Sequence, residues 1–206
     1  MAEKLIIIGA GGHGKVIADI ARLNGYKEIY FFDDDINKQF NGKYKVVGTL
    51  NDIGKYLNDY DFFVGIGDNQ IRKTITKRLN ELNIELPVLI HPSAIIDETV
   101  SIQPGTVVMA NVVINADSKI GNGCIINTSS SVDHDCLIND YAHISPGVHI
   151  AGTVSVGVCS WIGIGATVKN NVYIGSDCII GAGSVVTDNL LEPGTYLGVP
   201  ARRIHT

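Results

Sequence analysis

The chain has 206 residues, of which 45% are hydrophobic and 18% charged, and its formal net charge is −5. The acidic balance and the absence of a basic run argue against a general nucleic-acid binder or a binder of anionic membranes. The opening segment, KLIIIGAGGHG, is too short and too rich in glycine for a signal peptide or a membrane span. We therefore expect a cytoplasmic protein whose four cysteines are reduced thiols.

The first ninety residues predict alternating strands and helices. We expect strands over residues 4–8, 28–32 and 60–66, and helices over residues 15–23 and 69–82. Such alternation is typical of a parallel α/β sheet. The pattern changes near residue 90, which predicts a Rossmann-like half domain over 1–90 and a second domain over 91–206.

A glycine-rich loop connects the first strand to the first helix. Residues 9–14 read GAGGHG, which satisfies G-x-G-x-x-G, and Asp33 and Asp34 follow at the end of the second strand. Glycines let the backbone approach a diphosphate, and a helix N-terminus attracts negative charge. The domain has room for one mononucleotide half, which favours a nucleotide-diphosphate ligand over NAD, with a purely structural turn as the remaining alternative. His13, inside the loop, suits hydrogen bonding to a diphosphate or a sugar.

From residue 96 the chain repeats with a period of six. Isoleucine or valine occupies sixteen consecutive sixth positions, from Ile96 to Val186, and a small or apolar residue follows four positions after each. This period fits neither an α-helix nor a two-faced strand and is typical of a parallel β-helix, in which three hexads complete one coil. We expect about five coils, three cysteines at small inward positions, and association into a cyclic oligomer that covers the bare faces.

The histidines of the hexads are candidate catalytic residues. His134 is the third residue of its hexad and must point outward, between Asp133 and Asp135. A neighbouring carboxylate can orient an imidazole and raise its basicity, so His134 is a candidate general base. His143 lies half a coil further on, so the two histidines could share a site only across the interface of a three-fold oligomer. His149 is interpreted as a solvated turn residue.

A metal site is not expected in the hexad region. β-Helical carbonic anhydrases collect three histidines at an interface, and two of those ligands stack on one face of the same chain. Here no two histidines of the hexad region are separated by a whole number of coils. None of them can therefore stack on another in successive coils.

The whole chain resembles the sialic-acid O-acetyltransferase and nucleotide-amino-sugar N-acetyltransferase family of bacterial surface-glycan pathways. The motifs that carry the resemblance are GAGGHG, the aspartate pair, NTSS at 127–130 and VDHD at 132–135. It is most similar to the acetyltransferases that finish UDP-diacetylbacillosamine and GDP-N-acetylperosamine. The resemblance implies a left-handed parallel β-helix, a homotrimer, and acetyl-CoA as co-substrate.

The resemblance also implies roles for individual residues. His134 would be the base, and Asp135 would replace the glutamate that usually tunes it. Nucleotide-sugar binding is implied for Gly11, Gly12, His13, Asp33, Asp34 and Gly67. Acetyl-CoA binding is implied for His143, Gly152, Ile164, Ala182 and Arg202. No metal ligand is implied.

We predict an acetyl-CoA-dependent N-acetyltransferase that acts on the 4-amino group of a nucleotide-linked amino sugar, of the UDP-4-amino-4,6-dideoxy-N-acetylglucosamine type. No cysteine or serine is in an evident activated setting, so direct transfer with a histidine base is favoured over an acyl-enzyme. Two alternatives are a sugar O-acetyltransferase of the sialic-acid type and a non-catalytic nucleotide-sugar-binding solenoid. The solenoid predicts that His134→Ala leaves function intact and that acetyl-CoA does not stabilise the fold.

Overall fold

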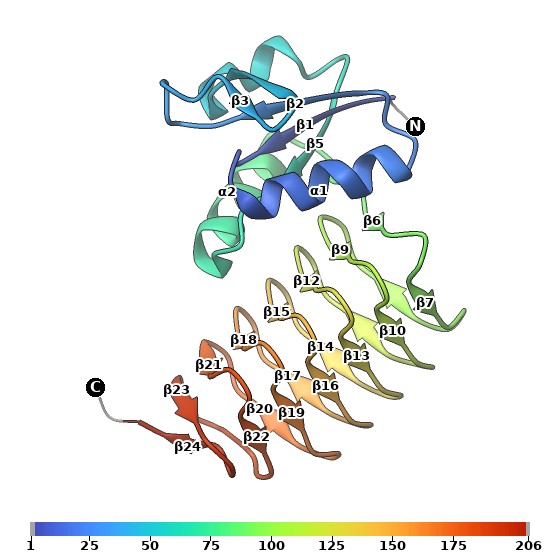
Figure 1. Ribbon diagram of the computed structural model, residues 1–206, viewed down its shortest axis with the longest axis vertical. Helices are drawn as coiled ribbons and strands as arrows, with labels where there is room; N and C mark the ends of the chain where they lie inside the picture. Colours follow the sequence, from blue (N-terminus) through green and yellow to red (C-terminus); the bar gives the residue numbers. More distant parts are fainter. Residues whose placement is uncertain (1–2, 205–206) are drawn as a thin grey trace.

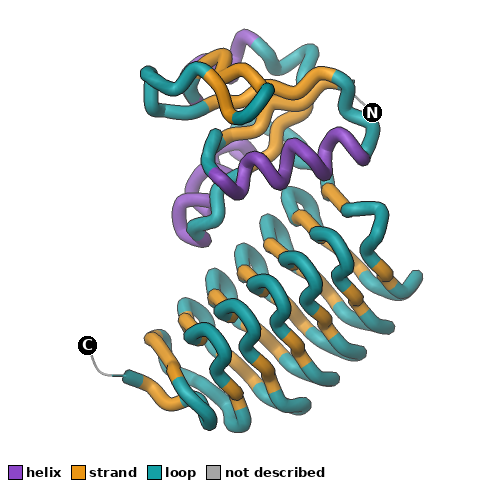
Figure 2. Tube along the Cα trace, in the orientation of Figure 1, coloured by secondary structure: helices purple, strands orange, loops and turns teal. Residues whose placement is uncertain are grey.

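The computed structural model describes residues 3–204 and contains an α/β sheet domain followed by a parallel β-helix (Figure 1). The fold class predicted from the sequence is therefore confirmed. The β-helix forms a row of stacked coils, and the N-terminal domain lies along one side of it (Figure 2). No helix within residues 3–204 is long and apolar enough to cross a membrane.

The N-terminal sheet has the strand order β3-β4-β2-β1-β5. Its elements are β1 (Lys4–Ile8), α1 (Gly12–Leu23), β2 (Glu28–Phe32), β3 (Phe40–Asn41), β4 (Tyr44–Gly48), the 3-10 helix η1 (Leu50–Lys55), β5 (Asp61–Val64) and α2 (Asn69–Glu81). β1 is parallel to β2 and β5, and β2 is parallel to β4, but β3 pairs antiparallel with β4. The sheet is therefore mixed and not purely parallel, and neither this hairpin nor η1 was predicted.

Both faces of this sheet are covered, because the side chains of its strands alternate between two cores. Leu5 and Ile7 pack with Ile17 of α1 on one face. Ile6 and Ile8 pack on the other face, with residues of η1 and α2. Strands buried on both sides explain why β1 reads as a continuous apolar run rather than an alternating one.

The β-helix consists almost entirely of two-residue strands. They are β6 (Leu89–Ile90), β7 (Ile95–Ile96), β8 (Ser101–Ile102), β9 (Val107–Val108), β10 (Val113–Ile114), β11 (Lys119–Ile120), β12 (Ile125–Ile126), β13 (Ser131–Val132), β14 (Leu137–Ile138), β15 (His143–Ile144), β16 (His149–Ile150), β17 (Ser155–Val156), β18 (Trp161–Ile162), β19 (Thr167–Val168), β20 (Tyr173–Ile174), β21 (Cys178–Ile180), β22 (Val185–Val186), β23 (Gly194–Leu197) and β24 (Arg202–Arg203). Within the hexads each pairs in parallel with the strand three hexads away, as Val113 does with Ser131. The coil length of three hexads is thus confirmed, although Ile90 already pairs with Val108, one hexad before the expected start.

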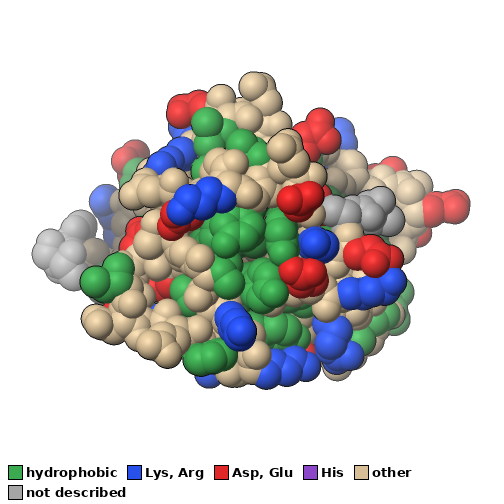
Figure 3. Space-filling view, turned by 90° about the horizontal axis from the view of Figure 1, so that it is seen from above, with side chains coloured by type: hydrophobic (Ala, Val, Ile, Leu, Met, Phe, Trp, Pro, Cys, Tyr) green, Lys and Arg blue, Asp and Glu red, His purple; other side chains and the backbone are tan. Residues whose placement is uncertain are grey.

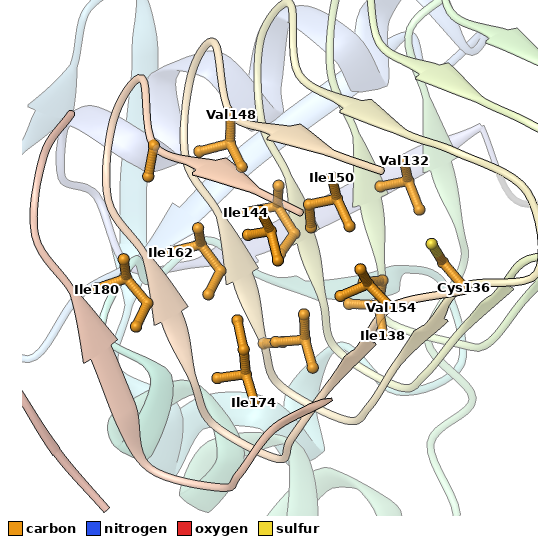
Figure 4. Close-up of a cluster of buried hydrophobic side chains, with 14 of the residues drawn as sticks. Val132, Cys136, Ile138, Ile144, Val148, Ile150, Val154, Ile162, Ile174 and Ile180 are labelled. Carbon is orange, nitrogen blue, oxygen red and sulfur yellow. The ribbon is translucent and has the colours of Figure 1, made fainter. Parts of the chain in front are cut away.

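The strands form three faces. Face 1 contains β7, β10, β13, β16, β19 and β22, face 2 contains β8, β11, β14, β17 and β20, and face 3 contains β6, β9, β12, β15, β18, β21, β23 and β24. The hexad isoleucines and valines point into the prism between the faces, where they form one core (Figure 4). Cys124, Cys136 and Cys178 are buried there as free thiols, as the hexad positions predict.

Tight corners connect the faces. A positive φ recurs at every sixth residue from Gly105 to Gly183, fourteen times in succession. Nine of these residues are not glycine, and Asp135 is among them with φ of 57°. The left-handed conformation is costly for most side chains but is tolerated by aspartate and asparagine. Asp135 is therefore held at a corner by the geometry of the coil itself.

The N-terminal domain covers part of face 3. The outward side chains of that face form a ladder with one rung in each coil, and the first three, Leu89, Val107 and Ile125, are buried in one core with α1. The next rungs of the ladder are His143, Trp161 and Ile179. Trp161 and Ile179 have 47% and 44% of their surface exposed. α1 thus lies between the N-terminal sheet and the β-helix (Figure 1). Ile125 is the last residue of the ladder in the core shared with α1.

The outer face of the N-terminal domain carries charges of both signs. Seen from above, apolar side chains gather near the middle, and basic and acidic side chains are interspersed around them (Figure 3). This face therefore carries no extended field of a single sign.

Candidate active site

Glycine occurs at several positions of the loop between β1 and α1, for different physical reasons. Gly9 has φ of 104°, and a Cβ on Gly14 would lie 2.2 Å from the carbonyl oxygen of Gly9. In contrast, the space beside Gly11 and Gly12 is open. The first and last glycines thus pack the helix against the sheet, whereas the middle two leave backbone accessible to a ligand at the helix N-terminus.

A small crevice lies beside this loop, at the carboxyl ends of the parallel strands. Its volume is about 190 Å³, and it is lined by Ile8, Gly9, Phe32, Asp33, Asp34, Leu50, Ile66 and Ile75. Asp33 accepts hydrogen bonds from the N–H groups of Ala10 and Asp35, at 2.8 and 3.0 Å, and from Lys38 Nζ at 3.3 Å. Burial would raise the pKa of Asp33, but these bonds hold it below its ordinary value. Asp33 therefore stabilises the loop, and Asp34 is the exposed carboxylate at this edge.

His13 lies in the first turn of α1, because the helix begins three residues earlier than the sequence predicted. Its Nε2 is buried and has no hydrogen-bond partner within the described part of the chain. Burial and the nearby charge of Arg72 lower the pKa of His13 to about 4, so the imidazole is neutral. An unpaired buried nitrogen is costly, which makes it a group able to bind a polar ligand atom.

A larger cavity, of about 480 Å³, lies between the first turn of α2 and face 3 of the β-helix. It is lined by Gly67, Asp68, Asn69, Gln70, His143, Cys159, Trp161, Asp177 and Ile179. Of the residues predicted to bind ligands, this cavity brings Gly67 and His143 together. Trp161 was not singled out from the sequence, although a tryptophan one coil after His143 must be its outward neighbour.

His143 is fixed on two sides in this cavity. Its ring stacks on Trp161 with centroids 5.8 Å apart, and its Nε2 lies 3.1 Å from the side-chain nitrogen of Asn127. Burial, then the charges of Arg72 and His13, lower the pKa of His143 to about 3. The imidazole is therefore neutral, and its Nε2 accepts a hydrogen bond from the Asn127 amide.

His134 is exposed at the corner that follows β13. Its Nδ1 lies 2.7 Å from Asp135 Oδ2, and its backbone N–H donates to Asp133 Oδ1 at 2.9 Å. The hydrogen bond to Asp135, together with the charges of Asp133 and Asp135, raises the pKa of His134. Because Nδ1 is bonded to the carboxylate, Nε2 is the nitrogen left to take a proton.

Gly152 supports the His134 ring from the next coil. A Cβ at this position would lie 2.5 Å from His134 Nε2 and 2.6 Å from its Cε1. The imidazole therefore rests directly on the glycine backbone. Any larger residue at position 152 would displace the ring.

The remaining predicted residues fall at other places in one chain. Ile164 and Ala182 lie one coil apart, at the corner between faces 3 and 1. Arg202 is in β24, where its Nη1 lies 3.4 Å from Asp188 Oδ2. The structure thus places Gly152 beside His134 and not beside His143. No group of three metal-ligating side chains is found within residues 3–204.

His134 and His143 do not share a site within one chain. His134 follows β13 on face 1, whereas His143 belongs to β15 on face 3. The half-coil separation read from the sequence therefore places them on different sides of the prism. His149 is exposed, as expected, but it lies in strand β16 and not in a turn.

Comparison with known protein families matches both parts of the chain. Residues 4–79 match the PglD N-terminal domain, and residues 153–188 match the bacterial transferase hexapeptide (six repeats). Among curated proteins, the UDP-N-acetylbacillosamine N-acetyltransferase of Bacillus subtilis (strain 168) is 37% identical over 101 residues. That alignment covers 47% of this chain and 47% of the relative, and the chain spans less than half the length of the curated relatives it matches.

Solved structures match along nearly the whole chain. The acetyltransferase domain of PglB from Neisseria gonorrhoeae FA1090 is 41% identical, with a TM-score of 0.94 and coverage of 98% of this chain and 100% of that domain. It has also been solved with acetyl coenzyme A. PerB from Caulobacter crescentus, in complex with CoA and GDP-perosamine, is 38% identical, with a TM-score of 0.93 and coverage of 98% and 97%. The chain therefore belongs to the PglD-type family of hexapeptide-repeat nucleotide-sugar N-acetyltransferases.

Proposed function

We propose that this protein is an acetyl-CoA-dependent N-acetyltransferase that acts on the amino group of a nucleotide-linked 4-amino sugar in glycan biosynthesis. The observation that carries the proposal is the exposed imidazole of His134, bonded through Nδ1 to Asp135 and resting on Gly152. No packing role explains an outward histidine fixed in this way. The similarity to the PglB domain with acetyl coenzyme A and to PerB with CoA and GDP-perosamine supports the same reaction.

His134 Nε2 is suited to remove the proton from the attacking amine. As the amine nitrogen forms a bond to the thioester carbonyl carbon, Nε2 takes the proton that the nitrogen loses. Backbone N–H groups of the coils stabilise the oxyanion that forms. The carbon–sulfur bond then breaks, and the CoA thiolate leaves with the proton held by His134. Asp135 favours the first step because it keeps the other ring nitrogen protonated and raises the basicity of the imidazole.

The acceptor has a suitable place in the N-terminal domain. The open backbone at Gly11 and Gly12, the unpaired His13 Nε2 and the carboxylate of Asp34 all lie around the first turn of α1 and the ends of β1 and β2. A diphosphate suits the helix N-terminus, and a carboxylate suits a ribose hydroxyl. Gly67 belongs to the adjoining loop after β5, and it lines the larger cavity together with His143.

We infer that the catalytic site lies between subunits of a homotrimer. His134 and His143 point away from different faces of one prism, so a neighbouring subunit is needed to bring the two imidazoles together. Ile164 and Ala182, which lie at another corner, and Arg202 of β24 would then contact acetyl-CoA in the groove between two prisms. Equilibrium sedimentation should give three chains per particle, and a stable monomer with full activity would refute this arrangement.

The reaction is tested by incubating the purified protein with acetyl-CoA and UDP-4-amino-4,6-dideoxy-N-acetylglucosamine. Tandem mass spectrometry should locate one new acetyl group on the 4-amino nitrogen of the sugar. Transfer to sialic acid but to no nucleotide-linked amino sugar would instead establish the O-acetyltransferase. Absence of transfer to UDP-, GDP- and dTDP-linked amino sugars, without thermal stabilisation by acetyl-CoA, would favour the non-catalytic solenoid.

A further inference from the structure

The first turn of α2 is hydrogen-bonded to four successive coils of the β-helix. Its polar side chains reach one residue in each coil, at equivalent positions along one edge. We call this edge the α2 corner; its residues are Gly123, Tyr141, Cys159 and Asp177. Arg72 donates hydrogen bonds to the carbonyls of Gly123 and Tyr141. Asn69 Nδ2 donates to the Cys159 carbonyl at 2.9 Å, and Gln70 Nε2 donates to Asp177 Oδ1 at 2.6 Å. The N-terminal domain is thus held at a defined position along the prism.

Arg72 makes most of these contacts and is itself almost completely buried, with 1% of its surface exposed. Nε donates to the Gly123 carbonyl at 2.7 Å, and Nη2 donates to the Tyr141 carbonyl at 2.8 Å. Nη1 donates to the carbonyls of Ile66 and Gly67, at 3.2 and 2.9 Å, and Nη2 also reaches the Asn69 side chain at 2.8 Å. All these acceptors are uncharged.

A buried guanidinium without a carboxylate partner lowers the stability of the folded state, because its charge is removed from water without an opposite charge nearby. An apolar side chain at this position would leave the buried carbonyls of Gly123 and Tyr141 without this donor. The arginine is therefore explained by its planar set of donors, which reaches three separate backbone segments at once.

Two of those segments form opposite walls of the 480 Å³ cavity. Gly67 belongs to the loop after β5, and Tyr141 lies two residues before His143 in the same coil. We propose that Arg72 is a positioning residue for acetyl transfer: it fixes the acceptor-binding loop of the N-terminal domain against the coil that carries His143. The inference deepens the proposed function and rests on it.

The charge of Arg72 has a second, supporting effect. After burial, it is the largest cause that lowers the pKa of both His13 and His143, which keeps the two imidazoles neutral. Neutral rings in the cavity can accept as well as donate hydrogen bonds to sugar hydroxyl and amide groups.

The test compares Arg72→Lys with Arg78→Lys, a control on the same helix whose side chain is exposed. Lysine keeps the charge but cannot reach three segments in one plane. We expect Arg72→Lys to lower kcat/KM for the nucleotide-linked amino sugar by about 100-fold, the loss typical of a misplacement near 1 Å, mainly through a higher KM for that sugar. KM for acetyl-CoA should stay at the wild-type value, and Arg78→Lys should match wild type in both constants.

A purely structural role predicts a different result, because partial unfolding lowers the active fraction and leaves both KM values unchanged. An Arg72→Lys enzyme with wild-type KM for the acceptor, or with equal losses for both substrates, would overturn the proposal. If Arg72→Lys does not fold, Asn69→Ala decides, since the Asn69 side chain accepts a hydrogen bond from Arg72 Nη2 at 2.8 Å and helps to hold the guanidinium in place. It should raise KM for the acceptor alone, and no change in that constant would refute the proposal. An inactive wild-type enzyme would instead contradict the proposed function.

Discussion

Replacement of Gly152 by alanine is expected to disable His134 without unfolding the β-helix. The new Cβ would lie 2.5 Å from His134 Nε2, whereas ordinary contacts begin at 3.4 Å. The imidazole must therefore retreat by about 1 Å, a displacement that typically lowers a catalytic rate by about 100-fold. Because the ring is exposed, it can move into solvent, and the buried core beneath it is not disturbed.

The assay measures kcat for acetyl transfer together with the thermal unfolding midpoint. Gly54→Ala is the matched control, because its Cβ would meet nothing within 4 Å. We expect Gly152→Ala to lose about 100-fold in kcat with an unfolding midpoint close to that of Gly54→Ala. Wild-type kcat in Gly152→Ala would show that the position of the His134 ring does not control the reaction.

Three further predictions address the base, the core and the glycine loop. Asp135→Asn removes the group that raises the pKa of His134, so the acidic limb of the kcat/KM–pH profile should move to lower pH; an unmoved limb would contradict this role. Ile144→Ala removes a fully buried side chain and should lower the free energy of unfolding in urea by about 2–5 kcal/mol. A loss within error of zero would contradict the core assignment. Gly14→Ala places a Cβ 2.2 Å from the Gly9 carbonyl oxygen, so nucleotide-sugar binding measured by calorimetry should be lost, and wild-type affinity would refute the packing argument.

The β-helix could be predicted because its repeat leaves little freedom. Each hexad must place a branched side chain in the prism, and a shift of one residue would expose the whole set. The first strand of the β-helix, Leu89–Ile90, was not predicted, although Ile90 lies six residues before Ile96 and fits the repeat. The neighbouring residue, Leu89, packs against α1 and does not face solvent. The apolar outward series at 89, 107 and 125, read coil by coil, is the signal that could have located this domain contact.

Other elements had weaker local signals. The β3–β4 hairpin is built on strands of two and five residues, too short for a periodic pattern, although a glycine at the first turn position, Gly42, is a recognised hairpin signal. The early start of α1 at Gly12 was unexpected, since glycine disfavours helix interiors. Packing of Gly14 against the backbone of Gly9 explains why the glycines are tolerated there.

Only those contacts of the candidate site that join residues close together in the sequence could be predicted. His134 and Asp135 are adjacent, so their hydrogen bond follows from one turn. The support of the ring by Gly152 depends on stacking of coils, and the buried position of Arg72 depends on the contact between domains. Neither a hexad pattern nor a helix pattern specifies such contacts. They require the three-dimensional position of one element on another.

In the proposed reaction, His134 removes a proton from the attacking amine. The most direct measurement is the rate of acetyl transfer by His134→Gln and wild type on the same nucleotide-linked amino sugar, with acetyl-CoA binding measured in parallel. We expect the variant to bind acetyl-CoA as wild type does but to transfer acetyl about 100- to 10,000-fold more slowly. Transfer at the wild-type rate by a variant without the imidazole would contradict the role of His134 as the base.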